Sequence, residues 1–349
     1  MPVPKLTTMR DLARIAGVDN STVSRALRHD PRISPATQKK ILRLAKRHGY
    51  VLNPLVSACM TFRKGTHTPK DVHTTLAYLI DDRYPPGKSW REGTSPLNYQ
   101  GALRQAEARG YRLEQFFLQP SLTAQRTCQI LQTRNIHGVL VAPLSWWGDL
   151  HLDFEWKQFS VVAIGFSLTE PPLYRVAHDF YQGMLLALHE CQKRGYTRPG
   201  FAVGSGLNKR IRNFWMAAYL VAQQSFEDSN RLKPFVVAGD TFDPQAFQRW
   251  VASERPDAII SLPFPFSRTD LWQELIAGFE RPIEWIHLDV HNLDGTEVGI
   301  YQDHEKIGAA AVDLLISLIE RNQLGPLKNS ETLLIEGSWI AGKSVKTAK

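Results

Sequence analysis

The sequence predicts two architectures in one chain: a small all-α helix-turn-helix headpiece, and an α/β body of two lobes built on doubly wound parallel sheets. Three observations support this prediction. The length of 349 residues suggests two or three domains. The segment 1–64 is strongly basic, whereas the remainder is nearly neutral. From about residue 75 onward, short apolar runs alternate with amphipathic helical segments.

The composition excludes several classes of protein. Hydrophobic residues make up 43% of the chain and charged residues 22%, a balance that argues against a largely disordered protein. No apolar run approaches the ~18 residues that a membrane span needs, and the first residues do not resemble a signal peptide. The scattered cysteines, Cys59, Cys128 and Cys191, argue against a disulfide scaffold. We therefore expect a cytoplasmic protein with no membrane partner.

The charge is concentrated at one end. The segment 1–64 contains 13 lysines and arginines, three aspartates and no glutamate, for a net charge of +10. Because the whole chain carries +8, the part after residue 64 carries −2. So basic a module is typical of a protein that binds a polyanion, although a solvated basic face would have the same charge.

The first half of the headpiece predicts a helix, a tight turn and a second helix. A helix is expected over residues 9–16, and Gly17 ends it because glycine tolerates the left-handed conformation. Asp19 is a suitable N-cap for a second helix over residues 20–27. The expected inward residues are Leu12, Ile15 and Ala16 in the first helix and Val23 and Leu27 in the second. This order is the helix-turn-helix pattern.

A third helix completes the headpiece. Ser34 is expected to cap it, Pro35 occupies its first position, and Gly49 ends it. Its inward residues are expected to be Ile41, Leu44 and Ala45.

The second helix is the expected site of base recognition. Its exposed positions are Asn20, Ser21 and Thr22 in the first turn and Arg25 one turn later. A helix of this kind places its first turn in the major groove, where Asn pairs with adenine and Arg with guanine. The residues suited to phosphate contacts are Thr8, Ser24, Arg28, Ser34 and Thr37. The alternative is a generic three-helix bundle with a polar surface.

Residues 7–54 resemble the DNA-binding headpiece of the lactose-repressor (LacI/GalR) family. The resemblance rests on A-x-x-A-G-V at 13–18, S-T-V-S-R-A-L at 21–27, I-S-x-x-T at 33–37, and the G-Y and N-P pairs at 49–54. The resemblance implies that Asn20, Ser21 and Arg25 occupy base-reading positions. It also implies that Thr8, Ser24, Ser34 and Thr37 contact phosphates.

A short hinge is expected after the headpiece, with Asn53 and Pro54 at its start. In the family, paired hinge helices form on operator DNA and insert a leucine into the minor groove. Cys59 stands at that position here, so the wedge is Cys59, or else Leu55 or Met60. The expected domains are the headpiece at 1–52, a hinge and linker at 53–70, and the body at 71–349.

The resemblance extends more loosely to the body and implies a sensor similar to sugar-binding periplasmic proteins. Apolar strand-like runs are expected at 76–80, 138–141, 161–164, 200–203, 235–237, 258–260 and 285–288. Helices are expected at 99–109, 123–134, 181–194, 212–225, 244–253, 270–278 and 305–321. The first lobe is expected at about 71–176 and 302–331, and the second at 177–301 and 332–349. A ligand would bind at the carboxyl ends of the strands, between the lobes.

The resemblance places Arg212 and Asp289 in this cleft, where charge-assisted hydrogen bonds could hold a polyol. The other candidate effector-binding residues are Asp81, at the end of the first strand, and the aromatic residues Trp90, Trp146, Trp147 and Phe242. Aromatic residues are more often core than ligand contacts. Trp215 stands where the family has glycine, and the run at 262–266 replaces the usual Asn-Asp, so the effector's identity stays open.

The resemblance implies a sequence-specific transcriptional regulator that binds a pseudo-palindromic operator as a homodimer, with repression as the default and activation as the alternative. Its effector would be a small molecule, a sugar or derivative, and no cofactor is expected. Two other classes stay open. One is a sugar-processing, hydrolase-like body fused to a DNA-binding head. The other is a solute-carrying binding protein, which would need export, and the basic head speaks against it. His287, Asp289 and His291 alternate as metal ligands could, but no second cluster supports a metal, and no catalytic or metal residue is assigned.

Overall fold

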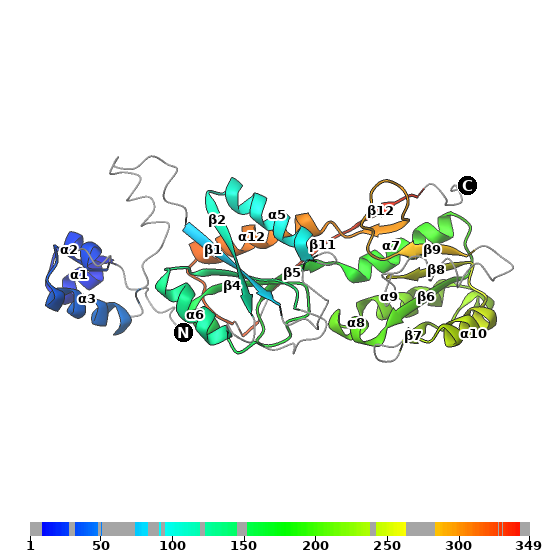
Figure 1. Ribbon diagram of the computed structural model, residues 1–349, viewed down its shortest axis with the longest axis horizontal. Helices are drawn as coiled ribbons and strands as arrows, with labels where there is room; N and C mark the ends of the chain where they lie inside the picture. The colour runs from blue at the N-terminus through cyan, green and yellow to red at the C-terminus, as the bar shows by residue number, and fades with distance from the viewer. Residues whose placement is uncertain are drawn as a thin grey trace. The chain divides into compact units, whose positions relative to one another are not determined.

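The computed structural model describes residues 9–27, 32–47, 50, 74–82, 91, 95–118, 123–144, 152–237, 242–262, 283–326, 328–329 and 331–342. The chain divides into two compact units, Met1–Thr74 and Thr75–Lys349, which we call the headpiece and the body (Figure 1). The helix expected over 270–278 lies outside the described residues.

Three helices build the headpiece: α1 (Met9–Ala16), α2 (Asn20–Ala26) and α3 (Pro35–Arg47). Two backbone hydrogen bonds close the end of α1. The N–H of Val18 donates to the Ala13 carbonyl at 3.1 Å, and that of Gly17 donates to the Arg14 carbonyl at 3.4 Å. Gly17 has a φ of +70°, so the ending is a Schellman motif, and the prediction that Gly17 ends the first helix is confirmed.

The starts of the other two helices differ from each other. Ser34 caps α3 as predicted, because its Oγ accepts the backbone N–H of Thr37 at 3.3 Å. Pro35 is the first residue of α3. Asp19 occupies the N-cap position of α2, but its side chain accepts no capping hydrogen bond there.

Seven buried residues form the headpiece core: Leu12, Ala13, Ala16, Val23, Ala26, Ile41 and Ala45. The prediction for Ile15 is wrong, since its side chain is 44% exposed. Ala13 takes its place, because α1 turns the face of Leu12, Ala13 and Ala16 toward the other helices. Leu27 and Leu44 are half-buried and pack against this core.

The first lobe of the body is built on a six-stranded sheet in the order β11-β5-β4-β3-β1-β2. Its strands are β1 (Thr74–Asp81), β2 (Tyr111–Leu118), β3 (Gly138–Val141), β4 (Ser160–Ile164), β5 (Tyr174–His178) and β11 (Thr332–Ile335). The pairings β1–β3, β3–β4, β4–β5 and β5–β11 are parallel. These registers bring the carboxyl ends of β1, β3, β4, β5 and β11 to one edge of the sheet.

Helices cover both faces of this sheet, as a doubly wound fold requires. On one face α5 (Ser95–Ala108) and α12 (His304–Glu320) pack together over Leu76, Tyr78 and Ile80 of β1 (Figure 1). On the other face α6 (Ala124–Thr133) and the 3-10 turn η1 (Trp156–Gln158) cover the alternate residues Ala77 and Leu79.

The second lobe is built on another six-stranded sheet, in the order β12-β10-β9-β8-β6-β7. Its strands are β6 (Pro199–Gly204), β7 (Phe235–Val237), β8 (Ala258–Ser261), β9 (Glu284–His287), β10 (Gly299–Tyr301) and β12 (Ser338–Ile340). All its pairings are parallel except β10–β12. Helices α7 (Phe180–Lys193), α8 (Ser205–Arg210) and α9 (Phe214–Ala222) share one hydrophobic cluster, and α10 (Pro244–Glu254) packs in a second cluster. Two 3-10 turns, η2 (Gln223–Ser225) and η3 (Asp228–Asn230), follow α9.

The chain passes between the two sheets three times: from β5 to α7, from β10 to α12, and from β11 to β12. The last passage corrects the expected lobe boundary, because Thr332–Ile335 pairs with β5 in the first sheet rather than joining the second lobe. The first passage follows His178, slightly later than expected. Both lobe boundaries depend on which strands pair, and strand pairing joins residues that are far apart in the sequence.

All seven expected strands and the six expected helices within the described residues are present. The apolar runs of the sequence do not predict the strands β2, β5, β10, β11 and β12, and the helix α8 is also unexpected. In the part of the chain that the structure describes, no helix is both long and apolar enough to cross a bilayer.

Candidate functional site

One face of α2 presents polar side chains outward. Asn20, Ser21 and Arg25 are exposed, whereas Thr22 and Ser24 are half-buried. Ser21 and Arg25 are one turn apart and therefore lie on the same side of the helix. Val23 and Ala26 are buried in the headpiece core, so the apolar side of α2 fixes the polar side in place. A carboxamide, a hydroxyl and a guanidinium on one helix can bond to base edges in a major groove.

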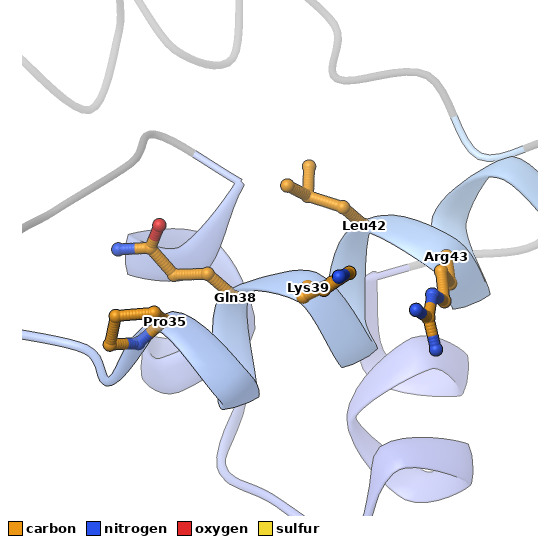
Figure 2. Close-up of a pocket in the computed structure, with 5 residues that line it drawn as sticks. All are labelled: Pro35, Gln38, Lys39, Leu42 and Arg43. Atoms are coloured by element: carbon orange, nitrogen blue, oxygen red, sulfur yellow. The ribbon is translucent and has the colours of Figure 1, made fainter.

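Helix α3 carries a second exposed, cationic surface. Five of its residues line a shallow hollow, Pro35, Gln38, Lys39, Leu42 and Arg43 (Figure 2). Lys39 and Arg43 are exposed and one turn apart, with half-buried Leu42 beside them. Lys40 faces elsewhere, because its Nζ donates to the Ala16 carbonyl at 2.9 Å and ties α3 to α1.

Cations flanking apolar surface suit a sugar-phosphate backbone. Lys39 and Arg43 are not among the predicted phosphate contacts, although their spacing of one turn in the third expected helix is a usable signal. Ser34 is exposed and Thr37 half-buried, and their hydroxyl oxygens lie 2.9 Å apart at the start of α3. The remaining DNA-binding predictions fall outside the described residues: Thr8, Arg28, Asn53, Leu55, Cys59 and Met60.

In the body, Asp289 lies just after β9 and is 9% exposed. Its carboxylate accepts a hydrogen bond from Nε2 of His304 at 2.9 Å and lies 3.5 Å from Nε2 of His291. Burial alone would raise the pKa of Asp289, but the two histidines outweigh burial and hold that pKa well below its usual range. The hydrogen bond to Asp289 in turn raises the pKa of His291. Asp289 is therefore a compensated anion.

These residues do not form a metal site. Of the alternating set at 287–291, His291 lies at the Asp289 carboxylate, and His287 has a buried Nδ1 without a hydrogen-bond partner. Within the described ranges, no three His, Cys, Asp or Glu side chains converge as metal ligands would.

His178 ends β5 at the first passage between the sheets and is 2% exposed. Its Nδ1 lies 3.1 Å from the Ile335 carbonyl, which only accepts, so Nδ1 carries the proton. Its Nε2 is buried without a partner. Burial lowers the pKa of His178 to about 4, so the ring is neutral near pH 7.

An aromatic cluster joins the two lobes just after β4. Phe166 of the first lobe packs against Phe180 and Phe214 of the second, with ring centroids 6.2 and 5.3 Å apart. Phe180 in turn meets Trp215 edge to face at 5.3 Å. We call the region around Phe166 the lobe boundary.

The predicted residue Arg212 lies at the lobe boundary. It is exposed, and its Cζ stands 5.0 Å from the centroid of the Phe166 ring. Arg175, which the sequence analysis missed, reaches the same ring at 5.5 Å from the strand β5. A charged residue between apolar neighbours at 173–177 is the sequence signal that could have drawn attention to it.

The other effector predictions have different outcomes. Asp81 is buried at the carboxyl end of β1. The carboxyl end of β4, which Phe166 follows, lies at the same edge of the sheet. Phe242 is half-buried and packs against Phe235 and Phe247 at the cluster around α10. A stacking role for Phe242 stays a prediction without a contact to support it. Trp90, Trp146 and Trp147 lie outside the described residues.

Comparison with known proteins identifies the headpiece. The family model described as "Bacterial regulatory proteins, lacI family" matches residues 8–53. The curated protein "Probable HTH-type transcriptional repressor ExuR" from Bacillus subtilis (strain 168) is 41% identical over 63 residues. That match covers 18% of this chain and 18% of the relative, so the whole relative's activity does not carry over to this chain. Over these residues the headpiece is a lacI-family domain.

Solved structures extend the likeness in fold to nearly the whole chain. The Lac repressor dimer bound to operator and the anti-inducer ONPF has a TM-score of 0.56 at 15% identity, covering 99% of each chain. The complex of the transcriptional regulator CelR with cellobiose has a TM-score of 0.52 at 19% identity, covering 97% of this chain and 99% of that one. At these identities the likeness establishes the fold: the LacI-type headpiece with a two-lobed, periplasmic-binding-protein-like body.

Proposed function

We propose that this chain is a sequence-specific transcriptional repressor of the LacI family. In this proposal two copies bind a pseudo-palindromic operator, and a small-molecule effector at the lobe boundary controls the binding. The observation that carries the proposal is the exposed polar face of α2, with Asn20, Ser21 and Arg25 held outward by a buried apolar side. That face stands on a headpiece whose sequence matches a family of regulatory proteins.

The charge of the headpiece supports DNA as the partner. The segment 1–64 has a net charge of +10, and the exposed cations include Arg25, Lys39 and Arg43. Each phosphate that such cations neutralise releases counterions, so affinity falls steeply with salt. The helix-turn-helix order indicates how the headpiece is oriented on DNA, because α2 is the element that enters a major groove in such folds.

The body supports a ligand-controlled regulator. Its two lobes are in contact where Phe166, just after the carboxyl end of β4, packs against Phe214 at the start of α9. The carboxyl ends of parallel strands are where α/β folds hold ligands. The CelR structure contains a sugar in a protein of this fold, which supports a carbohydrate or carbohydrate derivative as effector here. Asp289 is bound by His304 and His291, an arrangement that does not favour the hydrolase alternative.

Selection from a randomised duplex pool with the full chain tests the DNA proposal. We expect an enriched pseudo-palindrome whose half-sites are related by the two-fold symmetry of a dimer. Arg25→Ala should relax the preference at one base pair in each half-site. Arg14→Ala is the matched control, because Arg14 is an exposed headpiece arginine on α1 that pairs with Asp11 at 3.2 Å.

Two results would contradict the proposal. The first is a pool in which no sequence is enriched at any salt concentration. The second is an equal loss of affinity for all sequences in Arg25→Ala, which would assign Arg25 to phosphate and remove α2 as the base-reading helix.

A further inference from the structure

Two arginines from different lobes converge on one ring at the lobe boundary. The Cζ atoms of Arg175 and Arg212 lie 5.5 and 5.0 Å from the centroid of Phe166. Arg175 comes from β5 of the first lobe, and Arg212 precedes α9 in the second. Two positive charges that share a neighbour repel each other unless an anion compensates them.

No carboxylate supplies that compensation within the described residues. Arg175 is 1% exposed, and its two terminal nitrogens donate to the carbonyls of Gly165 at 2.8 Å and Leu168 at 3.2 Å. Its Nε is buried without a hydrogen-bond partner. Burial, with a contribution from Arg212, lowers the pKa of Arg175 to about 10, which still leaves the guanidinium charged at neutral pH. A buried guanidinium without a counterion is an uncommon and costly arrangement.

Arg212 also makes no ion pair with a carboxylate among the described residues, and it is exposed. It stands at the amino end of α9, where the N-cap residue Asn213 makes no side-chain capping bond. The positive end of a helix dipole favours an anion nearby, although the first N–H of α9, that of Phe214, already donates to the Ile211 carbonyl at 3.3 Å. Arg212 and Asn213 have φ values of 57° and 59°, a left-handed pair that costs arginine about 1–2 kcal/mol and sets its position beside this helix end.

The buried carboxylate of Asp289 is already occupied. It is bound by His304 and His291, so its charge is compensated locally and does not serve the arginines. The lobe boundary therefore combines an exposed arginine, a buried arginine with an unused N–H, and the positive end of a helix dipole.

We propose that the lobe boundary takes a small anionic ligand, a monosaccharide that carries a carboxylate or a phosphate. Arg212 contacts the oxyanion beside the amino end of α9, and Arg175 adds the second positive charge from the first lobe. The inference rests on the proposed function, in which the body holds the effector, and it specifies the class of that effector. A neutral sugar would leave both guanidinium charges uncompensated.

The test measures binding to the full chain by calorimetry and by the rise in melting temperature, since a ligand of the native state raises it. The probes are matched pairs: glucuronate, galacturonate and glucose 6-phosphate against glucose and galactose, with inorganic phosphate as the minimal anion. The variants are Arg212→Gln and the charge-retaining Arg175→Lys. The control is Arg249→Gln, an exposed arginine on α10 with the same change of charge.

We expect at least one sugar acid or the sugar phosphate to bind and its neutral parent not to bind. Arg212→Gln should weaken that binding about 10- to 100-fold, as expected for one lost charge-assisted hydrogen bond. Arg249→Gln should bind like the wild type, and Arg175→Lys should bind more weakly while still favouring the anion. Comparing the sugar acids with glucose 6-phosphate shows whether the ligand's negative group is a carboxylate or a phosphate.

The inference is overturned if neutral sugars bind and their anionic partners do not. It is also overturned if no probe binds, or if Arg212→Gln and wild type bind the anions equally. Operator selection with the same preparation separates this failure from failure of the proposed function. A chain that selects a palindrome but ignores every anion remains a DNA-binding regulator without an anionic effector.

Discussion

The buried ring of His178 predicts a specific loss of stability in acid. Its pKa is about 4 in the folded protein and 6.5 in an unfolded chain. The folded state thus binds fewer protons than the unfolded state between those values, so stability falls as the pH is lowered through this window. The geometry explains the sign, because protonation places an N–H on Nε2, which is buried without an acceptor. A Cβ built on Gly183 would lie only 2.7 Å from that nitrogen.

The size of the effect follows from the two pKa values. Lowering the pH from 7.5 to 5 should remove about 2 kcal/mol of the stability of the body, and the full difference between 6.5 and about 4 corresponds to ~3 kcal/mol. Urea unfolding followed by tryptophan fluorescence at both pH values measures this loss. His178→Gln removes the titration while keeping a side-chain N–H that can donate to the Ile335 carbonyl.

Other groups also titrate over this range, so the decisive quantity is a difference. The acid-induced loss of stability should be smaller in His178→Gln than in the wild type by about 2 kcal/mol, the contribution of this one ring. His189→Gln, a change at an exposed histidine on α7, should show the wild-type loss. Parallel pH curves for wild type and His178→Gln would refute the reasoning and show that the ring is solvated in the folded state.

Three further predictions concern the headpiece and Asp289. Gly17→Ala should destabilise the headpiece by ~1–2 kcal/mol in thermal unfolding. Since nothing lies within 4 Å of the added Cβ, the cost comes only from the backbone φ of +70°. An unchanged melting temperature would contradict this. Arg25→Ala should cost ~1–3 kcal/mol at one base pair per half-site in competition binding, and uniform weakening would count against base reading. Asp289→Ala should leave His304 without its partner and lower the free energy of unfolding in urea by ~1–3 kcal/mol. Operator affinity should stay intact. A loss of operator binding would show that Asp289 acts on DNA recognition.

The headpiece was predictable because its signals are local. Gly17, Ser34 and Pro35 each act through bonds to near neighbours in the chain, and the structure places them at the expected helix ends. The buried face of α1 was harder to predict, because Ala13 and Ile15 are both apolar. Which of them faces inward depends on where α2 and α3 lie, and a sequence period alone does not contain that information.

The body was predictable where strands are continuous apolar runs and not where they are mixed. β2 alternates exposed, half-buried and buried residues at the edge of the sheet, and β5 contains Arg175. β11 pairs with β5, although the whole second sheet except β12 separates them in the chain, so its lobe could not be read from its neighbours. A similar separation hid the site, because the arginine on β5 and Arg212 come together at Phe166, and neither spacing nor composition connects them.

The three passages between the lobes are packed on one another, which bears on how a ligand could control this protein. His178 of the first passage donates from Nδ1 to the carbonyl of Ile335 at the start of the third. A Cβ on Gly337 of the third would lie 2.8 Å from the Tyr301 carbonyl of the second and 2.9 Å from the His178 ring.

Such contacts leave no room for one passage to turn alone. Close-packed elements of this kind switch between discrete arrangements instead of deforming gradually. A ligand held by Arg212 in one lobe and by the charge of Arg175 in the other would favour one arrangement of the lobes by its difference in affinity for the two. Coupling to DNA is then worth only that difference, typically ~1–3 kcal/mol, and is reciprocal: operator DNA must change the affinity for the ligand by the same factor.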